Sequence, residues 1–364
     1  MKRDLYIDFA KGLATVSVIF IHTVFWSGQF YVPAEVRTLS LLFDVVLFYA
    51  LSGITSGGNV DKTFYRLLKL QITYMIFVTG VFFVDYLFKV FGLNFFGLQW
   101  MENFYSTFGG KYVPQSISTV PQWQNLGNWY MHSYTNADTF PVIMGSFWYL
   151  KVYFILAVFG VLIIRFFPKH IWWFVAVCLG LTMIYHIFPH YFPTGQVAYV
   201  AFYLAVFLIG NRLKGKKISN MLAVVLYAGV FAALAWVFTG YGKEIFYLFN
   251  KNKFPPRIPY IIWITFGVVT LFVLYNRLKI NRKSIITHIG ENAIFFYFAQ
   301  GISSTLIYFL VRPLEEQMPW WILLPIIFAV NLVLAYFIAL LLKKIDDFGW
   351  NILRILQKNT ASDK

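Results

Sequence analysis

The chain has 364 residues, of which 59% are hydrophobic and 21% aromatic, whereas only 12% are charged. Soluble domains carry about 25% charged residues, and a soluble protein would have to expose large apolar patches to accommodate 41 Phe, 24 Tyr and 12 Trp residues. The formal net charge of +15 does not indicate a nucleic-acid-binding protein, because such proteins gather their basic residues on polar, solvated elements. The composition therefore predicts a polytopic membrane protein without a nucleic-acid partner, whose positive charges lie in loops.

The start of the chain resembles a signal peptide in one respect, since Lys2 and Arg3 precede an apolar stretch. Asp8 and Lys11 interrupt that stretch, however, and no small-residue cleavage site follows it. We therefore expect residues 7–27 to form a first transmembrane helix that is retained.

Ten apolar runs come close to the roughly 20 residues that a helix needs to cross the hydrocarbon core of a membrane. Twenty of the 30 Lys and Arg residues fall in segments on the side of the N-terminus, and 8 fall on the other side. Because positive residues are enriched in cytoplasmic loops, both termini are predicted to be cytoplasmic. One transmembrane domain is expected over 1–345, followed by a short cytoplasmic tail at 346–364. The predicted fold is all-α, a polytopic integral membrane protein with about ten transmembrane helices, at residues 7–27, 39–57, 71–91, 146–165, 171–188, 197–211, 220–239, 258–276, 285–311 and 321–342.

Two predicted outer loops stand out by their composition. Residues 92–145 mix Trp and Tyr with Asn, Gln and Ser, and a loop of this length is usually functional or disordered. Its aromatic residues predict either a cap that stacks on sugar rings or an interfacial aromatic belt. The loop 240–257 carries three Lys and one Arg, among them Lys253. These charges could attract an anionic polymer or a lipid-linked phosphate, or simply face a leaflet surface.

The first predicted helix carries ionisable residues, which are costly inside a membrane and are therefore functional candidates. At 3.6 residues per turn, one face of this helix contains Asp4, Asp8, Lys11, Thr15 and His22. This polar stripe starts at the predicted cytoplasmic edge, and His22 lies about 16 Å beyond Lys11 at 1.5 Å per residue. Because lipid would leave these groups unpaired, we expect the stripe to face the interior of the bundle or a watery cavity.

His22 is the candidate general base. Asp44 enters the second predicted span from the outer side, at a depth similar to that of His22. If the two spans are neighbours, the carboxylate could orient the imidazole and favour its protonated form. The alternative is a histidine satisfied by an interhelical hydrogen bond. The stripe and Asp44 together favour the functional interpretation.

Other candidate residues carry weaker signals. The single cysteine, Cys178, lies in an apolar run, and with one cysteine no disulfide forms within the chain. His186 and His190 are four residues apart, but Pro189 interrupts the helix between them and no third ligand is apparent. We therefore expect no metal site and no permanently bound cofactor.

A basic cluster precedes the third predicted span. Lys62, Arg66 and Lys69 have the spacing of a single helix face. This face could hold an anionic cytosolic ligand or meet anionic lipid, and both interpretations stay open.

Several of these residues fall in motifs that resemble the acyltransferase-3 family of bacterial integral-membrane O-acyltransferases. The run from Arg3 to Gly12, followed by His22, is similar to the opening of that family: Arg, four residues, Asp, two residues, a basic residue and Gly, then His eleven positions past the basic residue. Asp44 to Gly53 resembles the family's Asp-Leu-Phe-Phe-x-Leu-Ser-Gly stretch. The resemblance covers the whole chain, with further similar segments at Phe64–Lys69 and Tyr74, at Phe147–Leu150 and at Gly290–Gln300.

The sequence departs from the family pattern at three positions. Lys11 stands where many members have Arg, which keeps the charge but loses the bidentate fork. Lys151 lies where the family has an acidic residue just after the fourth-span Trp, and Gln300 replaces a late His. These departures suggest the polysaccharide-modifying branch, without the additional extracellular domain that some members carry.

The resemblance implies a multi-pass membrane O-acyltransferase of the bacterial plasma membrane. Such an enzyme moves an acetyl or similar short acyl group from acetyl-CoA, or another acyl-CoA, to a hydroxyl of a capsular or other cell-surface polysaccharide or of a lipid-linked glycan. His22 would be the general base or a transient acyl carrier, with Asp44 as its orienter. The other expected site residues are Lys11, Arg66 and Lys69 for the CoA phosphates and Trp148 and Tyr149 for substrate.

An exporter or transporter of glycan units or lipid-linked precursors is the alternative from another class, since ten helices with central ionisable residues also suit it. Inverted repeats would favour a transporter, and none is visible in the sequence. A glycan polymerase would present arginines in its large outer loop, whereas the basic residue of 92–145 is Lys111.

Overall fold

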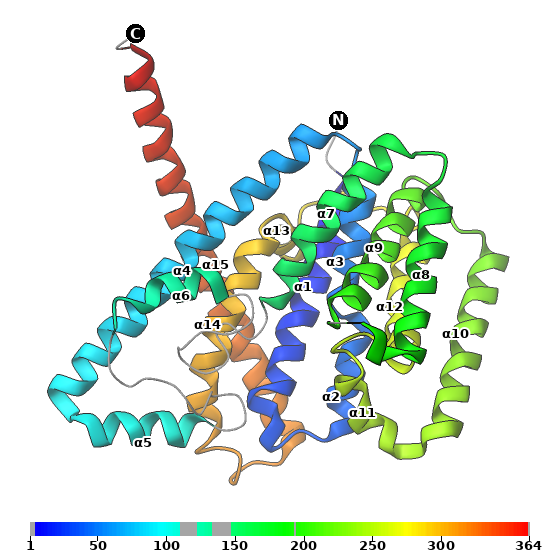
Figure 1. Cartoon of the computed structure of the whole chain (residues 1–364). Helices are drawn as coiled ribbons and strands as arrows, with labels where there is room; N and C mark the ends of the chain where they lie inside the picture. Colours follow the sequence, from blue (N-terminus) through cyan, green and yellow to red (C-terminus); the bar gives the residue numbers. More distant parts are fainter. Residues whose placement is uncertain (1–3, 110–121, 133–146, 193, 363–364) are drawn as a thin grey trace. The chain divides into compact units, whose positions relative to one another are not determined.

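The computed structural model describes residues 4–109, 122–132, 147–192 and 194–362 (Figure 1). These residues form α-helices and short 3₁₀ helices, and no strand occurs among them. The α-helices are α1 (Leu5–Phe25), α2 (Ala34–Ser40), α3 (Val46–Thr55), α4 (Val60–Phe96), α5 (Leu98–Gly109), α6 (Asn125–His132), α7 (Trp148–Phe166), α8 (Ile171–Ile187), α9 (Gln196–Leu213), α10 (Asn220–Tyr241), α11 (Ile245–Lys251), α12 (Ile258–Leu274), α13 (Ile285–Glu291), α14 (Ala293–Val311) and α15 (Trp320–Ser362).

The predicted membrane fold is confirmed. Within the described part of the chain, 8 helical segments are long and apolar enough to cross a membrane, and two shorter apolar helices, α8 and α12, occupy the other two predicted spans. Helices suit this environment because they satisfy the backbone hydrogen bonds internally, where the hydrocarbon core offers no water. The protein is therefore an all-α, multi-pass membrane protein.

The chain divides into two compact units. Unit 1 comprises Met1–Arg66 and Tyr149–Glu291, and unit 2 comprises Leu67–Trp148 and Asn292–Lys364. In unit 1, α1 packs with α13, α3 with α9, α8 with α9, and α10 with α12. In unit 2, α14 packs along α15. The transmembrane domain expected over 1–345 thus consists of two units.

Contacts within unit 1 group the helix ends as the charge pattern predicts. The hydroxyl of Tyr6, at the start of α1, donates to the carbonyl oxygen of Leu271, at the end of α12, at 2.8 Å. Asn211, near the end of α9, donates from Nδ2 to the carbonyl oxygen of Ser56, just after α3, at 3.0 Å. A hydrogen bond between the loops that follow α9 and α12 joins these two pairs. The start of α1 therefore lies at the same end of unit 1 as the ends of α3, α9 and α12, which is the predicted cytoplasmic end.

Glycines bring α3 and α9 into backbone contact. A Cβ atom at Gly53 of α3 would overlap the carbonyl oxygen of Phe207, and one at Gly210 of α9 would overlap the carbonyl oxygen of Ala50. In lipid, helices gain no hydrophobic driving force from associating, and close backbone approach at small residues supplies the packing energy instead. The two glycines therefore set how closely these spans pack.

The segment 92–145, expected to be an outer loop, is helical over much of its described part. Helix α4 continues to Phe96, Gly97 turns the chain with a φ of 81°, and α5 and α6 follow. Positive φ favours glycine because it has no Cβ atom. A search for runs of about 20 apolar residues overlooks such short helices, whose apolar residues recur at helical spacing among polar ones.

Two tryptophans of this segment contact α4 within unit 2. The ring of Trp123 lies 4.3 Å from that of Tyr86 on α4, between centroids, and Trp129 is buried against the same helix. Trp129 thus contributes to packing, whereas Trp123 is 49% exposed, and the sugar-binding cap and the interfacial belt both stay predictions for it. Tyr112 and Tyr134, also expected in the cap, lie outside the described residues.

Two helices differ in extent from their predicted spans. The ninth span, 285–311, is interrupted at Asn292, which separates α13 from α14. Helix α15 continues without a break into the predicted tail, to Ser362. In its extension, Asp346 accepts a hydrogen bond from Oγ1 of Thr73 on α4 at 2.8 Å. The beginning of the predicted tail is therefore a packed part of unit 2.

We predict that Gly53→Val destabilises unit 1, because the added side chain would meet the backbone of α9. Overpacking of this kind costs about 1–3 kcal/mol or more. The measurement is thermal unfolding of the purified protein in detergent. Gly229→Val is the matched control, since a Cβ atom at this glycine of α10 meets nothing within 4 Å. Equal melting temperatures for the two variants would contradict the prediction.

Candidate active site

Helix α1 carries the predicted polar stripe on one continuous helix. Asp4 caps its start by accepting a hydrogen bond from the backbone of the first turn at 3.0 Å. Asp8 and Thr15 are buried, and Lys11 and His22 are half-buried. Thr15 donates from Oγ1 to the carbonyl oxygen of Lys11 at 2.8 Å. From Asp8 to His22 the stripe therefore lies on a buried or half-buried face, as expected for ionisable groups in a membrane span, whereas Asp4 at its start is exposed.

Helix α13 contacts the stripe at backbone distance. A Cβ atom at Gly12 would overlap the carbonyl oxygen of Ile286 on α13, and one at Gly290 would overlap the carbonyl oxygen of Asp8 on α1. The two glycines thus set the crossing of α1 and α13 beside Lys11. The sequence pattern places Gly290 within the predicted span 285–311 and does not reveal its contact with α1.

The imidazole of His22 is held by a ring contact. It stacks on the indole of Trp26, with 4.0 Å between ring centroids and 5° between planes. Trp26 follows His22 by one helical turn, and its backbone N–H donates to the carbonyl oxygen of His22 at 3.0 Å. Stacking fixes the plane of the imidazole, which a group that moves protons requires. The spacing of four residues between His22 and Trp26 could have indicated this contact from the sequence, because residues at that spacing lie on one helix face.

Asp44 lies in a buried polar cluster at the end of unit 1 that is opposite the start of α1. It stands between a 3₁₀ turn and α3, where its Oδ1 accepts a hydrogen bond from the backbone N–H of Val45 at 2.6 Å. Its Oδ2 accepts from the hydroxyl of Tyr260 at 2.6 Å and pairs with Nζ of Lys253 at 2.7 Å. Asp44 is 1% exposed and Lys253 is 6% exposed. A buried ion pair with this many hydrogen bonds makes each partner depend on the other.

This cluster changes the interpretation of Lys253. Its loop, 240–257, was expected to present four basic residues to an anionic surface, but Lys253 turns inward to Asp44. The contacts of Asp44 with Val45, Tyr260 and Lys253 give it a positioning role in unit 1. Its predicted action on His22 stays a prediction.

The predicted cytoplasmic end of unit 1 gathers basic side chains on two joined loops. Asn276 donates from Nδ2 to the carbonyl oxygen of Lys216 at 3.2 Å, and Arg277 donates from Nη2 to that of Ile218 at 2.8 Å. The ring of Tyr275 lies 5.4 Å from that of Tyr6 on α1, between centroids. These contacts join the loops to each other and to the start of the stripe. The exposed cations on them are Lys214, Lys216, Lys217, Lys279, Arg282 and Lys283.

The family of the chain follows from its match to a family model described as an acyltransferase domain, which covers residues 4–340. The chain belongs to the acyltransferase-3 family. No curated protein and no solved structure matches it. With its apolar helices, the protein is a multi-pass membrane acyltransferase, and this membership favours an enzyme over the exporter considered from the sequence.

The cations expected to bind the donor occupy different environments in this acyltransferase. Lys11 is half-buried on α1, and Arg66 is exposed on the first turns of α4, where unit 1 ends. Lys69 is exposed one turn further, in unit 2, with Nζ 5.1 Å from the ring centroid of Trp350. Lys11 thus differs from the other two in being set beside a packed helix crossing.

The residues expected to bind the acceptor also differ. Tyr149 is buried in unit 1 among other tyrosines: its ring lies 4.8 Å from that of Tyr49, whose hydroxyl donates to the carbonyl oxygen of Tyr149 at 3.3 Å. Trp148 is half-buried and is the last residue of the first segment of unit 2. These contacts give Tyr149 a packing role, and the binding of substrate by either residue stays a prediction.

Apart from Lys11, the positions at which the acyltransferase departs from its family lie on helices other than α1. Lys151 is half-buried on α7, and Gln300 is fully buried on α14. Cys178 is buried. Among the described residues, no group of three or more His, Cys, Asp or Glu side chains could hold a metal ion.

We predict that Asp44→Ala destabilises the acyltransferase by about 3–5 kcal/mol, because it leaves the ammonium of Lys253 buried without its carboxylate. Asp44→Ala combined with Lys253→Met should lose less than Asp44→Ala alone. The measurement is the melting temperature of each variant in detergent. Lys251→Met, which removes an exposed cation from the preceding turn, is the control and should melt like the wild type. Losses that simply add in the double variant would contradict the coupling.

Proposed function

We propose that this membrane acyltransferase moves an acetyl or similar short acyl group from acyl-CoA in the cytoplasm to a hydroxyl of a cell-surface polysaccharide or lipid-linked glycan, in the bacterial plasma membrane. The observation that carries the proposal is the polar stripe of α1, which joins a basic end of unit 1 to a half-buried, stacked imidazole. Both reactants need access to one reacting centre, and a stripe of polar groups across a span supplies a path to it.

The basic end of unit 1 supports an acyl-CoA donor. CoA carries several phosphate groups, which lysine and arginine bind through charge-assisted hydrogen bonds. Lys11 and Arg66 are the proposed phosphate contacts, with the exposed cations of the two joined loops as the surrounding positive field. The pantetheine arm is an extended, uncharged chain, so it can carry the thioester away from the phosphates and along the stripe. Lys69 was expected as a third contact, and that role stays a prediction.

His22 is the proposed general base. Its imidazole takes the proton of the acceptor hydroxyl as the oxygen attacks the thioester carbonyl. The C–S bond then breaks, the acyl group remains on the acceptor oxygen as an ester, and the proton passes to the CoA thiolate. The stack with Trp26 keeps the ring in one plane while the proton moves. A route through acyl-His22, in which the imidazole carries the acyl group between donor and acceptor, uses the same residue.

Asp44 is proposed as a positioning residue. Its ion pair with Lys253 and its hydrogen bond with Tyr260 tie the segment before α12 and the first turn of α12 to the start of α3. Because α1 also contacts α3, this cluster supports the part of unit 1 in which α1 is held. Asp44 thereby acts on the reaction through the placement of helices.

We predict that His22→Ala abolishes acyl transfer, with a loss of about 10²–10⁴-fold in turnover, the usual contribution of a general base. The measurement is release of the CoA thiol from acetyl-CoA by purified protein with a glycan acceptor. His170→Ala, which alters an exposed histidine on the loop before α8, is the matched control and should retain wild-type turnover.

Full turnover by the His22 variant would defeat the proposed mechanism, and no donor turnover by the wild type would defeat the proposed donor. Analysis of surface glycan from cells with and without the protein tests the acceptor. The expected result is the loss of one ester-linked acyl group, and unchanged glycan esters would rule out this class of acceptor.

We predict that Lys11→Gln and Arg66→Gln each raise KM for acetyl-CoA by about tenfold or more, because a hydrogen bond to a charged group contributes about 1.5–3 kcal/mol. Turnover at saturating donor should change little. S-acetylpantetheine lacks the nucleotide and all the phosphates of CoA, so its KM should be the same for the wild type and the two variants. The control is Lys243→Gln, an exposed cation on the predicted outer side. Equal increases in KM for both thioesters would show that these cations do not bind the CoA phosphates.

A further inference from the structure

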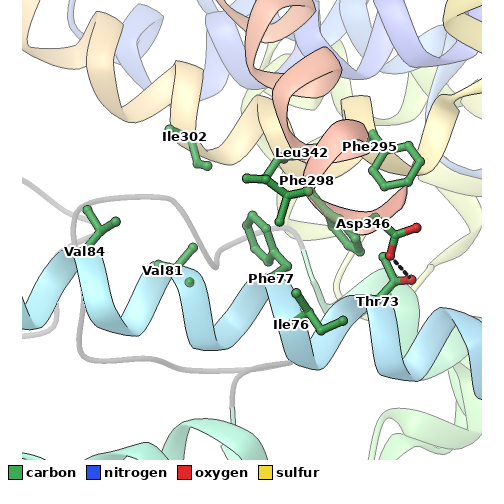
Figure 2. A pocket seen from close by; sticks show the side chains of 12 residues that line it. Thr73, Ile76, Phe77, Val81, Val84, Phe295, Phe298, Ile302, Leu342 and Asp346 are labelled. Atoms are coloured by element: carbon green, nitrogen blue, oxygen red, sulfur yellow. Dashed lines mark hydrogen bonds between the residues drawn. The ribbon is translucent and has the colours of Figure 1, made fainter. Parts of the chain in front are cut away.

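Unit 2 contains an apolar groove between α4, α14 and α15. Figure 2 shows its wall on α4, with Ile76, Phe77, Val81 and Val84, facing residues of α14 and α15 across a gap. The cavity has a volume of about 270 Å³. The rings of Phe77 and Phe298 stack at 4.8 Å between centroids at one side of it. The groove is lined almost entirely by hydrocarbon.

The length of the groove matches one leaflet of a membrane. Its wall on α4 extends from Thr73 to Val84, which lie eleven positions apart, or about 16 Å at 1.5 Å per residue. The hydrocarbon core of a bilayer is about 30 Å thick, so one leaflet contributes about half of that. Thr73 lies toward the end of α4 that is predicted to be cytoplasmic, and the groove therefore spans the cytoplasmic leaflet.

The rim of the groove is apolar and open to the surroundings of unit 2. Val84 is 61% exposed, and Ile76 and Ile345 are also exposed. On a helix that spans a membrane, exposed apolar side chains face lipid tails. A lipid chain can therefore enter the groove sideways from the bilayer without crossing a polar surface.

The predicted cytoplasmic end of the groove is polar and carries a cation. There Oδ1 of Asp346 accepts hydrogen bonds from Oγ1 of Thr73 at 2.8 Å and from Nε1 of Trp350 at 3.2 Å. Lys69 lies beyond this pair, with Nζ 5.1 Å from the ring of Trp350. The carboxylate is held by its two donors inside unit 2, while the ammonium is exposed at the depth where a phospholipid headgroup would lie. A cation at this level complements the anionic lipids of a cytoplasmic leaflet.

We propose that this groove binds one acyl chain of an anionic phospholipid from the cytoplasmic leaflet, with the headgroup phosphate against Lys69. The groove lies in unit 2, and its lining residues are outside the stripe of α1, so the inference does not rest on the proposed reaction. It assigns Lys69, which was expected to contact the CoA phosphates, to a lipid headgroup instead. It assigns the acyltransferase a specific lipid site in addition to the ordinary lipid shell of a membrane protein.

Gly80 offers a direct test, because it lines the groove and a Cβ atom there meets nothing within 4 Å. Gly80→Leu should fill the groove without disturbing its walls. Native mass spectrometry of the purified protein, after delipidation and addition of phosphatidylglycerol, measures the bound lipid. The variant should retain this lipid about tenfold less strongly than the wild type, the effect of withdrawing roughly two methylene groups from an apolar site.

Gly229→Leu is the matched control, since this glycine also lies within a membrane-spanning helix with open space around it, and it should bind like the wild type. Melting temperatures of both variants, each close to that of the wild type, show that they fold. Lys69→Gln should remove the preference for phosphatidylglycerol over phosphatidylcholine while the groove still takes a chain.

Equal retention of phosphatidylglycerol by Gly80→Leu, Gly229→Leu and the wild type would overturn the proposal, as would a wild type that binds phosphatidylcholine equally well. Displacement of the lipid by palmitoyl-CoA, but not by CoA, would assign the groove to a long-chain donor instead. Thiol release from acetyl-CoA is followed in the same samples. Turnover that persists while lipid retention is lost separates a failure of the lipid site from a failure of the proposed reaction.

Discussion

The hydrocarbon core of a membrane offers no water to a charged group, so each ionisable residue in a span needs a partner within the protein. At Asp44 this constraint shapes one end of unit 1. The chain leaves a 3₁₀ turn and enters α3 at this residue, and its carboxylate satisfies the backbone N–H of Val45, the hydroxyl of Tyr260 and the ammonium of Lys253. One side chain thus supplies the polar partner for a backbone N–H at the start of a helix, for a buried phenol and for a buried cation. The placement of the segment before α12 relative to α3 depends on it.

The same constraint is met differently at the predicted cytoplasmic end of unit 1. Polar residues of α1 are covered there by α13, a helix of 7 residues. Because Gly12 and Gly290 have no side chains, the two backbones meet and carbonyl oxygens come close to the stripe. The interruption at Asn292 ends α13 after this contact. A short, interrupted helix can therefore shield polar groups that a continuous apolar span would leave in contact with hydrocarbon side chains.

Features that depend on local periodicity could be predicted from the sequence. The spans follow from runs of apolar residues, and the stripe follows from the recurrence of Asp8, Lys11, Thr15 and His22 at helical spacing. Both are properties of one segment at a time. The structure bears out the all-helical membrane fold, and the stripe from Asp8 to His22 is buried or half-buried on one helix.

Features that depend on contacts between distant segments could not be predicted. Nothing local distinguishes Lys253 from its basic neighbours, yet Lys253 is buried against Asp44. The similar depth of His22 and Asp44 predicts that they act together, and this stays a prediction, because depth does not determine the direction of a side chain around a helix. The close contact of Gly12 with α13 likewise could not be predicted, because the sequence does not show which helices meet. Trp26 is the intermediate case, because its spacing from His22 was visible in the sequence although its stacking was not.

The placement of the basic residues says more about this protein than their excess. Cations such as Lys216 and Arg282 lie on exposed loops, where water, lipid headgroups and bound phosphates can all compensate them. Lys253 is compensated in place by Asp44. Lys11 belongs to neither group: it is half-buried on a span, beside a helix crossing that Gly12 makes rigid. A phosphate bound at Lys11 would therefore be held at a set distance from His22, about 16 Å along the same helix, so that one rigid element relates the proposed donor contact to the proposed general base.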